Sequence, residues 1–454
     1  MIADHLTFCH NLEARRQSTH GPVGENDITT DDHASPDHMD VEQIRKDFPI
    51  LEKEIGGKLP IYFDSACQTL RPKQVTEAVA EYYDSFPSCA GRSVHKFATE
   101  VSLRCDSVRA RVADFFGAES PSELAFMKNT TEGLNTVVFG SRLKKGDEIV
   151  TTDYEHNSVH VPVLQLAKTL GVRHKIVESS ADGTFDLEGF EKAMTKKVRL
   201  VVMPVTSNVT GYTLPAKEVV QIAHSYGAKV LLDAAQAAPS MKIDVRKLGV
   251  DYMAASAHKM CGPSGVGLLY YRAELAEMVE PLMYGGHGVT DTNRTSFKLL
   301  PAPERFETGL QNYSGIVGTG AAIEYLSSIG MDSIREHEVS LNKRMTRALR
   351  DVPGVRLILP EDPNLRGGIF SFNIDGLSAH DIAMILDNSR NIMMRSGMHC
   401  CHSYFHSRGI DGCARASVYV YNTSSEADVF IEAVKDLADK FGKRGQSATK
   451  AKMA

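Results

Sequence analysis

Alternating short apolar runs and amphipathic segments between Asp147 and Lys259 constrain the fold of this chain most strongly. Strands are expected at 147–153, 173–179, 198–207, 228–236 and 252–259, and helices at 160–171, 187–195 and 216–227. A further buried strand, GLLYY, is expected at 267–271. Short apolar strands separated by helices that end at glycine are typical of crossover units. The pattern therefore predicts an α/β fold with a mainly parallel sheet.

The composition limits the class of protein. A chain of 454 residues with 42% hydrophobic residues exceeds what one core usually covers, so two globular domains are expected. The net charge of -6 and the lack of a long basic run give no reason to expect nucleic acid as a partner. No apolar stretch is long enough to cross a bilayer, and the N-terminus lacks the apolar core of a secretory signal. We therefore expect a cytoplasmic protein without a membrane partner.

The cysteines and the two ends of the chain are also informative. Eight cysteines without regular spacing or a C-x-x-C pair predict reduced thiols rather than a disulfide framework. Residues 1–40 have no hydrophobic period and are expected to form a disordered or loosely attached extension. Order is expected to begin near DVEQIRKDFPIL, and residues 443–454 are expected to be a polar tail.

Polar residues follow several of the predicted strands. Ligands of parallel sheets bind at the carboxyl ends of the strands, so residues at these positions are candidates for a site. The candidates selected by this rule are His156, Asn208, Asp233, Gln236, Ser256, His258 and Lys259.

Lys259 lies between a predicted strand and a glycine-containing loop in DYMAASAHKMCGPSGVGLLYYR. Its small neighbours and the glycines after it allow a close approach to another molecule, which predicts that the lysine faces a cleft. A desolvated lysine has a lowered pKa and can act as a nucleophile or form a Schiff base. The alternative from this stretch alone is an ordinary surface cation.

The segment NTTEGLN at 129–135 precedes an apolar helix. The backbone N–H groups and hydroxyls of Thr130 and Thr131 would form an anion site at its N-terminus, although an ordinary helix cap has the same pattern. Together with Lys259 and Asp233, phosphate is the better explanation. A cofactor that needs a Schiff-base lysine, a phosphate site and a carboxylate for a pyridinium nitrogen is pyridoxal 5'-phosphate.

From about Tyr62 to Asn422 the chain resembles the class V aminotransferase family of fold-type I enzymes, specifically the second group of cysteine desulfurases and selenocysteine lyases. The motifs that carry the resemblance are YFDSA, FMKNTTEGLN, EHNSVHVP, TSNVTG, LLDAAQAAP, SAHKMCGPSGVGLLY, RFETGLQN, RSGMHC and CARASVYVYNT. The resemblance implies the fold of type I transferases that depend on pyridoxal phosphate. We expect a large cofactor-binding domain at 41–315, whose N-terminal segment packs on a smaller α+β C-terminal domain at 316–442.

The resemblance also implies roles for individual residues. Lys259 would hold the cofactor covalently, and Asp233 would keep its ring nitrogen protonated. The remaining implied roles are Gln236 at the ring oxygen, His156 on the ring face and in proton transfer, Thr130, Thr131, Ser256 and His258 at the phosphate, and Asn208, Arg395 and Arg415 at the substrate. An arginine suits a carboxylate because it makes a two-pronged contact.

Cys400, in RSGMHCCHSYFHSRGIDGCARAS, lies where the family pattern R-x-G-x-H-C has its nucleophile. A thiolate near Arg395 and His399 fits nucleophilic sulfur. The implied reaction converts L-cysteine to L-alanine and leaves a persulfide on Cys400, which would supply sulfur to iron-sulfur cluster assembly or another thiolation pathway. Cys401 is a bystander in one interpretation, and in the other it accepts or resolves the persulfide.

Several features leave other reactions open. The chain departs from the family pattern around the substrate at Met398, the CHSYF stretch, Gly91 and Cys67. The stretch SCAGRSVH matches that pattern only through Arg92 and His95. Selenocysteine lyase, cysteine sulfinate desulfinase, C–S lyase, epimerase and transaminase activity are the alternatives on this scaffold. A non-catalytic metal-binding scaffold is a more remote one. The HCCH stretch resembles a metal cluster, but adjacent cysteines suit one tetrahedral ion poorly, so we expect no metal.

Relatives of this kind are homodimers with active sites at the subunit boundary. MYGGHGVTDTN resembles the loop that reaches the phosphate in the neighbouring subunit, which makes Thr292 a candidate for cofactor binding. The expected partners are therefore an amino-acid substrate, a second copy of the chain and a sulfur-acceptor protein.

Overall fold

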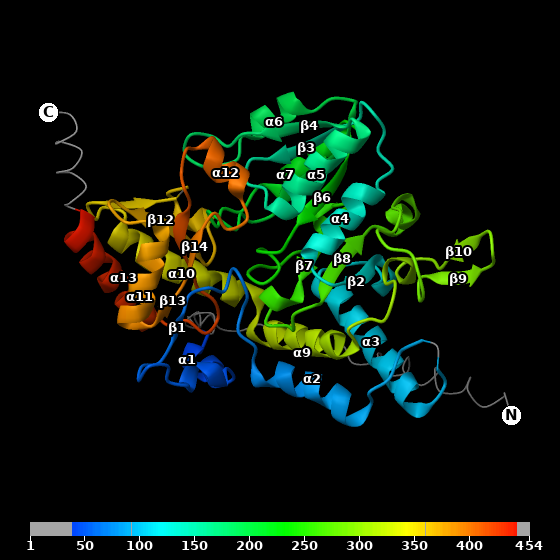
Figure 1. The fold of residues 1–454 in the computed structure, drawn as a ribbon, viewed down its shortest axis with the longest axis horizontal. Helices are drawn as coiled ribbons and strands as arrows, with labels where there is room; N and C mark the ends of the chain where they lie inside the picture. Colours follow the sequence, from blue (N-terminus) through cyan, green and yellow to red (C-terminus); the bar gives the residue numbers. More distant parts are fainter. Residues whose placement is uncertain (1–38, 92, 359, 443–454) are drawn as a thin grey trace, which may run out of the picture. The chain divides into compact units, whose positions relative to one another are not determined.

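A seven-stranded sheet lies at the centre of the residues that the computed structural model describes, which are 39–91, 93–358 and 360–442 (Figure 1). Its strands follow the order β2 (Leu124–Met127), β8 (Gly267–Tyr271), β7 (Tyr252–Ser256), β6 (Lys229–Asp233), β5 (Val198–Pro204), β3 (Glu148–Thr152) and β4 (Arg173–Val177). From β7 to β4 all neighbours are parallel, whereas β8 is antiparallel to both β7 and β2. The predicted α/β fold with a mainly parallel sheet is confirmed.

The central strands are apolar because both faces of the sheet are covered. In β6, Val230 and Leu232 belong to one core cluster and Leu231 to the other, as the alternation of side chains along a strand requires. β4 lies at the edge of the sheet, and four of its five residues are exposed or only partly buried. Its sequence RHKIV is correspondingly more polar than that of the inner strands.

The described helices cover the sheets and connect the strands. Their bounds are α1 (Val41–Arg45), α2 (Lys73–Ser85), α3 (Lys96–Phe115), α4 (Thr130–Gly140), α5 (Asn157–Leu170), α6 (Leu187–Ala193), α7 (Ala216–Ser225), α8 (Val245–Leu248), α9 (Tyr313–Ile329), α10 (Met331–Leu349), α11 (Ala379–Arg390), α12 (His402–Ser407) and α13 (Ser424–Leu437). The predicted helices at 160–171, 187–195 and 216–227 correspond to α5, α6 and α7. α4 packs on β7 and β8, while α2 and α3 pack on α9 (Figure 1).

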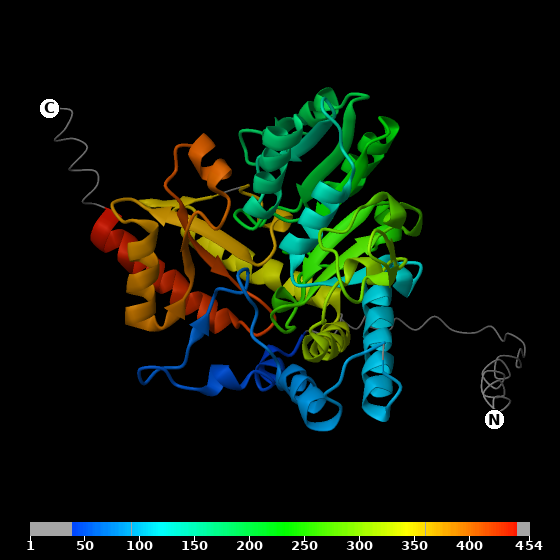
Figure 2. The same cartoon turned by 45° about the vertical axis from the view of Figure 1, so that its right-hand side comes forward.

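A second sheet is formed by the C-terminal part of the chain. It has the order β11 (Val355–Leu357), β12 (Ile369–Ile374), β15 (Cys413–Ser417) and β14 (Arg395–Gly397), all antiparallel. Next to it, β1 (Ile61–Tyr62) pairs in parallel with β13 (Ile392–Met393), so a blue N-terminal segment lies beside the yellow and orange C-terminal elements (Figure 2). The domain boundary at 315/316 stays a prediction.

The remaining strands form a hairpin of β9 (Val289–Thr292) and β10 (Phe297–Leu299). Within the described part of the chain, no helix has both the length and the apolar character that a membrane span requires. The predictions for residues 1–38, Arg92 and 443–454 lie outside the described residues.

Gly267 allows β8 to pass very close to the segment before α4. A Cβ at this position would lie 2.5 Å from the backbone carbonyl carbon of Asn129 and 2.6 Å from its Cα. Only glycine fits such an approach. Because Asn129 caps α4, this contact fixes where the N-terminus of the helix lies relative to the edge of the sheet.

Candidate active site

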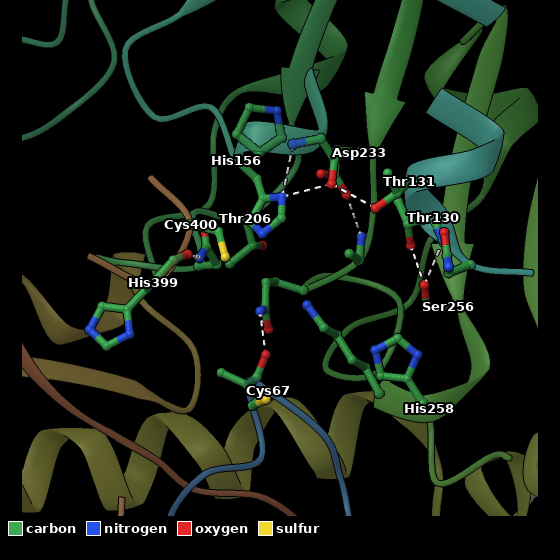
Figure 3. A pocket seen from close by; sticks show the side chains of 18 of the residues that line it. Cys67, Thr130, Thr131, His156, Thr206, Asp233, Ser256, His258, His399 and Cys400 are labelled. Carbon is green, nitrogen blue, oxygen red and sulfur yellow. Dashed lines mark hydrogen bonds between the residues drawn. The ribbon is translucent and has the colours of Figure 1, made fainter. Parts of the chain in front are cut away.

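One cavity of about 270 Å³ brings the predicted residues together (Figure 3). Its walls come from the carboxyl edge of the large sheet, from the segment after β1 and from the region of β14 and β15. Twelve of the thirteen predicted site residues line it, namely Thr130, Thr131, His156, Asn208, Asp233, Gln236, Ser256, His258, Lys259, Arg395, Cys400 and Arg415. The thirteenth, Thr292, lies on the exposed β9–β10 hairpin and outside this cavity.

Lys259 and Asp233 reach the cavity from neighbouring parallel strands. Asp233 ends β6, and Lys259 ends the short 3-10 turn that follows β7. Burial lowers the pKa of Lys259, and the nearby carboxylate of Asp233 opposes that effect. Burial raises the pKa of Asp233, which is 7% exposed and accepts a hydrogen bond of 2.9 Å from the backbone N–H of Ala235. An amine with a lowered pKa near a buried acid is typical of a covalent cofactor site.

Hydroxyl groups surround the N-terminus of α4. The backbone N–H of Thr130 donates to Oγ of Ser256 at 2.7 Å, and the two side-chain oxygens are 2.5 Å apart. Oγ1 of Thr131 lies 2.7 Å from Oγ of Ser158. A helix N-terminus with hydroxyls around it can bind an anion, and the phosphate site predicted here stays a prediction. Ser158 was not among the predicted residues, although its place two positions after His156 at a helix start was a usable signal.

His156 caps α5 and is held in one orientation. Its Nδ1 accepts the backbone N–H of Ser158 at 3.1 Å and lies 2.8 Å from the hydroxyl of the same residue. This pattern assigns the proton of the neutral ring to Nε2. Burial, followed by the charges of Lys259 and Arg415, lowers the pKa of His156 to about 4. The ring is therefore neutral at pH 7, with Nε2–H as its available donor.

The loop that carries Cys400 is held by contacts from the large sheet. His399 and Cys400 have φ angles of 47° and 59°, a region that costs a residue with a side chain about 1–3 kcal/mol. The backbone N–H of Asn157 donates to the carbonyl of Cys400 at 2.7 Å, and Nδ2 of Asn208 donates to the carbonyl of His399 at 2.8 Å. Cys400 itself is exposed, and it lines the cavity.

Asn208, which the sequence predicts at the substrate, also contacts the cysteine loop, and this contact was not predicted. Its Oδ1 accepts the thiol of Cys401 at 2.9 Å, so both ends of the amide contact the cysteine loop. Cys401 is fully buried, and burial raises the pKa of its thiol. A buried thiol that donates to an amide is poorly suited to accept sulfur. Between the two interpretations of Cys401, the geometry favours a structural role.

Beyond the loop, Arg408 attaches the following segment to the large sheet. Its guanidinium forms an ion pair with the buried carboxylate of Asp153 at 2.5 Å and donates to Ser179 at 2.6 Å. The same group lies 3.9 Å from the ring centroid of Tyr404 in α12. These contacts hold the chain on the C-terminal side of Cys400, as the Asn208 amide holds it at the cysteine loop itself.

Two arginines form one wall of the cavity. Arg395 and Arg415 are direct partners in the β14–β15 ladder, so their side chains leave the sheet on the same face. Arg415 is 2% exposed and donates to the carbonyl of Asn208 at 2.8 Å and to Asp64 at 3.4 Å. Its Nε has no hydrogen-bond partner among the described residues. Nη1 of Arg395 contacts Sγ of Cys67 at 2.5 Å, which the sequence did not predict.

The structure also shows the contacts of Gln236 and His95, two further residues that the sequence analysis named. Nε2 of Gln236 donates to the carbonyl of Ala66 at 2.8 Å. His95 caps α3 by accepting the N–H of Ala98, which is a structural role. In the described ranges, no group of three or more His, Cys, Asp or Glu residues is placed to hold a metal ion.

Comparisons with known proteins identify the family. The profile of the family described as Aminotransferase class-V matches residues 61–430. The chain belongs to the class V aminotransferase family. A probable cysteine desulfurase from Streptomyces coelicolor is 38% identical over 416 residues, which cover 90% of this chain and 99% of that protein. A cysteine desulfurase from Enterobacter sp. is 36% identical over 399 residues, covering 87% and 97%.

A solved structure extends the comparison to three dimensions. The apo structure of a cysteine desulfurase from Thermococcus onnurineus NA1 is similar to this chain with a TM-score of 0.84 and 38% identity, and the match covers 88% of this chain and 98% of that one. The family assignment from sequence motifs is therefore confirmed.

The residues of this class V aminotransferase chain fit pyridoxal 5'-phosphate. The cavity holds an amine that burial makes less basic, a buried carboxylate, and a helix N-terminus with four hydroxyls. These groups match an aldehyde, a ring nitrogen and a phosphate, respectively.

Proposed function

We propose that this protein is a cysteine desulfurase that depends on pyridoxal 5'-phosphate and converts L-cysteine to L-alanine. The observation that carries the proposal is that Cys400 and Lys259 line one cavity together with the buried Arg415. Relatives of 36–38% identity that are named cysteine desulfurase or probable cysteine desulfurase support it.

In this proposal, the cofactor is held by residues of the large sheet. Lys259 binds it covalently, Asp233 pairs with the ring nitrogen, and Gln236 addresses the ring oxygen. Thr130, Thr131, Ser256 and His258, at the N-terminus of α4, would bind its phosphate. The cofactor would supply an acceptor for the electron pair that the substrate releases as its Cα loses a proton.

The substrate carboxylate binds to the arginine wall. Nε of Arg415 is buried without a partner among the described residues, so a carboxylate oxygen supplies the acceptor that it lacks. Arg395 and Asn208 complete this side of the substrate. His156, neutral at pH 7, would lie at the cofactor ring and present Nε2–H as a hydrogen-bond donor.

Cys400 receives the sulfur. Its Sγ forms an S–S bond to the substrate sulfur while the carbon–sulfur bond of the substrate breaks, and the carbon that loses sulfur gains a proton. The net change is L-cysteine and a thiol to L-alanine and a persulfide, so atoms and electrons balance without an oxidant. The positive φ angles of His399 and Cys400 are consistent with a strained, functional loop.

The test uses purified protein loaded with cofactor. Alanine and sulfide are measured in parallel with L-cysteine, L-selenocysteine and L-cysteine sulfinate. We expect Lys259→Ala to abolish the visible absorption of the bound cofactor, and Cys400→Ser to lower alanine formation from L-cysteine by about 100-fold or more. Cys89→Ser removes an exposed thiol outside the cavity and is the matched control.

The same assay separates the alternatives. Full activity of Cys400→Ser on L-cysteine would reject the proposed nucleophile. Activity on selenocysteine or sulfinate alone would assign the protein to those reactions instead, because their leaving groups depart without a thiol nucleophile.

We further propose a cytoplasmic homodimer that passes its persulfide sulfur to an acceptor protein for iron-sulfur cluster assembly or another thiolation pathway. Thr292, exposed on the β9–β10 hairpin, then reaches the cofactor phosphate of the second copy. Analytical ultracentrifugation tests the dimer. A fully active monomer would reject it, and unchanged cofactor affinity in Thr292→Ala would reject the role of the hairpin.

A further inference from the structure

The active-site cavity contains a second thiol that the proposed reaction does not use. Cys67 lies in the segment after β1 and is partly buried. It lines the same cavity as Cys400 and Lys259, and Figure 3 shows both cysteine side chains at this cavity, reached from different segments of the chain. Cys401, by contrast, is buried, hydrogen-bonded to Asn208 and absent from the cavity wall.

The sulfur of Cys67 lies at the electropositive wall. Nη1 of Arg395 is 2.5 Å from Sγ, and a guanidinium has donors only, so the sulfur is the acceptor. Arg395 is paired in the sheet with Arg415, and Cys67 is among the groups whose charge acts on Arg415. An anion on Cys67 would therefore be near two guanidinium groups. A persulfide is such an anion, and charge-assisted hydrogen bonds from arginine stabilise it.

The arginine wall also connects the two cysteines. Arg395 begins β14, and the same segment of chain continues through His399 to Cys400. His399 is close enough to both arginines for their charges to lower its pKa, after the larger effect of burial. The persulfide on Cys400 and the thiol of Cys67 thus face one shared, positively charged space.

We infer that Cys67 is a second sulfur carrier, to which the outer sulfur of the Cys400 persulfide is transferred. This inference depends on the proposed function, because that reaction loads Cys400. In the transfer, Sγ of Cys67 forms a bond to the outer sulfur, the bond between that sulfur and Sγ of Cys400 breaks, and the proton of the Cys67 thiol passes to Cys400. One persulfide is exchanged for another, so no oxidant or reductant is consumed.

Transfer to Cys67 has a functional consequence. It would free Cys400 for the next substrate while the first sulfur is held on the wall of the cavity by Arg395. An enzyme with both thiols would then hold two sulfur atoms per chain, whereas one with Cys400 alone would hold one.

The test locates the sulfur in holoenzyme. Protein with bound cofactor is mixed with L-cysteine, sampled over time and alkylated without reductant, and the peptides that contain Cys67 and Cys400 are examined by mass spectrometry. Alanine is measured in the same samples. The variants are Cys67→Ala, Cys67→Ser and Cys400→Ser, with Cys89→Ser as the control for an unrelated exposed thiol. The visible absorption of the cofactor verifies that each variant is folded and loaded.

We expect the extra sulfur to appear first on Cys400 and then on Cys67 in the wild type and in Cys89→Ser. The extra sulfur should stay confined to Cys400 in both Cys67 variants. In Cys400→Ser, the amount of extra sulfur on Cys67 should fall at least about tenfold. Alanine formation with no extra sulfur on Cys67 would overturn the inference alone. Equal loading of Cys67 in Cys400→Ser, or a disulfide between the two cysteines in place of a persulfide, would also overturn it. Wild-type protein that forms no alanine would reject the proposed function itself.

Discussion

The close passage of β8 past the start of α4 gives a quantitative prediction for Gly267→Ala. The added Cβ would lie 2.5–2.6 Å from three backbone atoms of Asn129. Carbon contacts are normal at roughly 3.5–4.0 Å, so the backbone must move by about 1 Å. Overpacking of this kind costs about 1–3 kcal/mol of unfolding free energy. The helix start that moves includes Thr130, whose N–H donates to Ser256 in the proposed phosphate site.

Two measurements check this prediction. Urea titration of the apoprotein should give an unfolding free energy lowered by about 1–3 kcal/mol, and cofactor titration followed by visible absorption should give a weaker affinity. A displacement of about 1 Å in a reacting geometry costs about 100-fold in rate, so alanine formation should fall as well. Gly286→Ala is the control, because nothing lies within 4 Å of its added Cβ. Equal stability and cofactor affinity in the two variants would refute the reasoning.

Further predictions concern the cysteine loop and the titration of the site. Cys401→Ala removes the donor to the buried amide oxygen of Asn208 and should lower the unfolding free energy, measured in urea, by about 1–3 kcal/mol. Cys401→Ser keeps a donor and should recover part of that loss. Equal losses in the two variants would contradict the role of this hydrogen bond. Arg408→Ala leaves the buried Asp153 carboxylate unpaired and should cost about 3 kcal/mol, while Arg344→Ala, which breaks an exposed pair, should leave the urea midpoint nearly unchanged. Burial lowers the pKa of His399 to about 3, so the unfolded chain binds more protons below about pH 6.5 and the apoprotein should lose stability as the pH falls from about 6.5 towards 3. Identical urea midpoints for the wild type at pH 7 and pH 5 would contradict this sign.

The sequence predicted the large sheet well because its signal is local. Each inner strand spans five to seven residues and contains a short apolar run, and the crossover helices end near glycine or a polar residue. The hydrophobic pattern and the helix ends therefore indicate the same elements. The rule that ligands bind at the carboxyl ends of parallel strands then selected Asp233 and Lys259 from the strand pattern alone. The same physics accounts for His156, which follows β3.

The contacts of the arginine wall could not be predicted in this way. Cys67 and Arg395 are 328 positions apart, and no periodic pattern links a coil after β1 to the start of β14. The hydrogen bonds between Asn208 and the cysteine loop also depend on how the C-terminal sheet lies beside the large one. Side-chain partners across such distances are decided by tertiary packing, which a linear pattern does not encode.

The pairing of β1 with β13 has a consequence for synthesis on the ribosome. Ile61 finds its strand partner Ile392 only after most of the chain has emerged. The last strand of the large sheet along the sequence is β8, so this sheet can form much earlier, because domains fold in the order in which they are made. The wall that contains Cys67 is therefore completed last. A nascent chain stalled before residue 392 would have only part of the cavity wall and would be inactive.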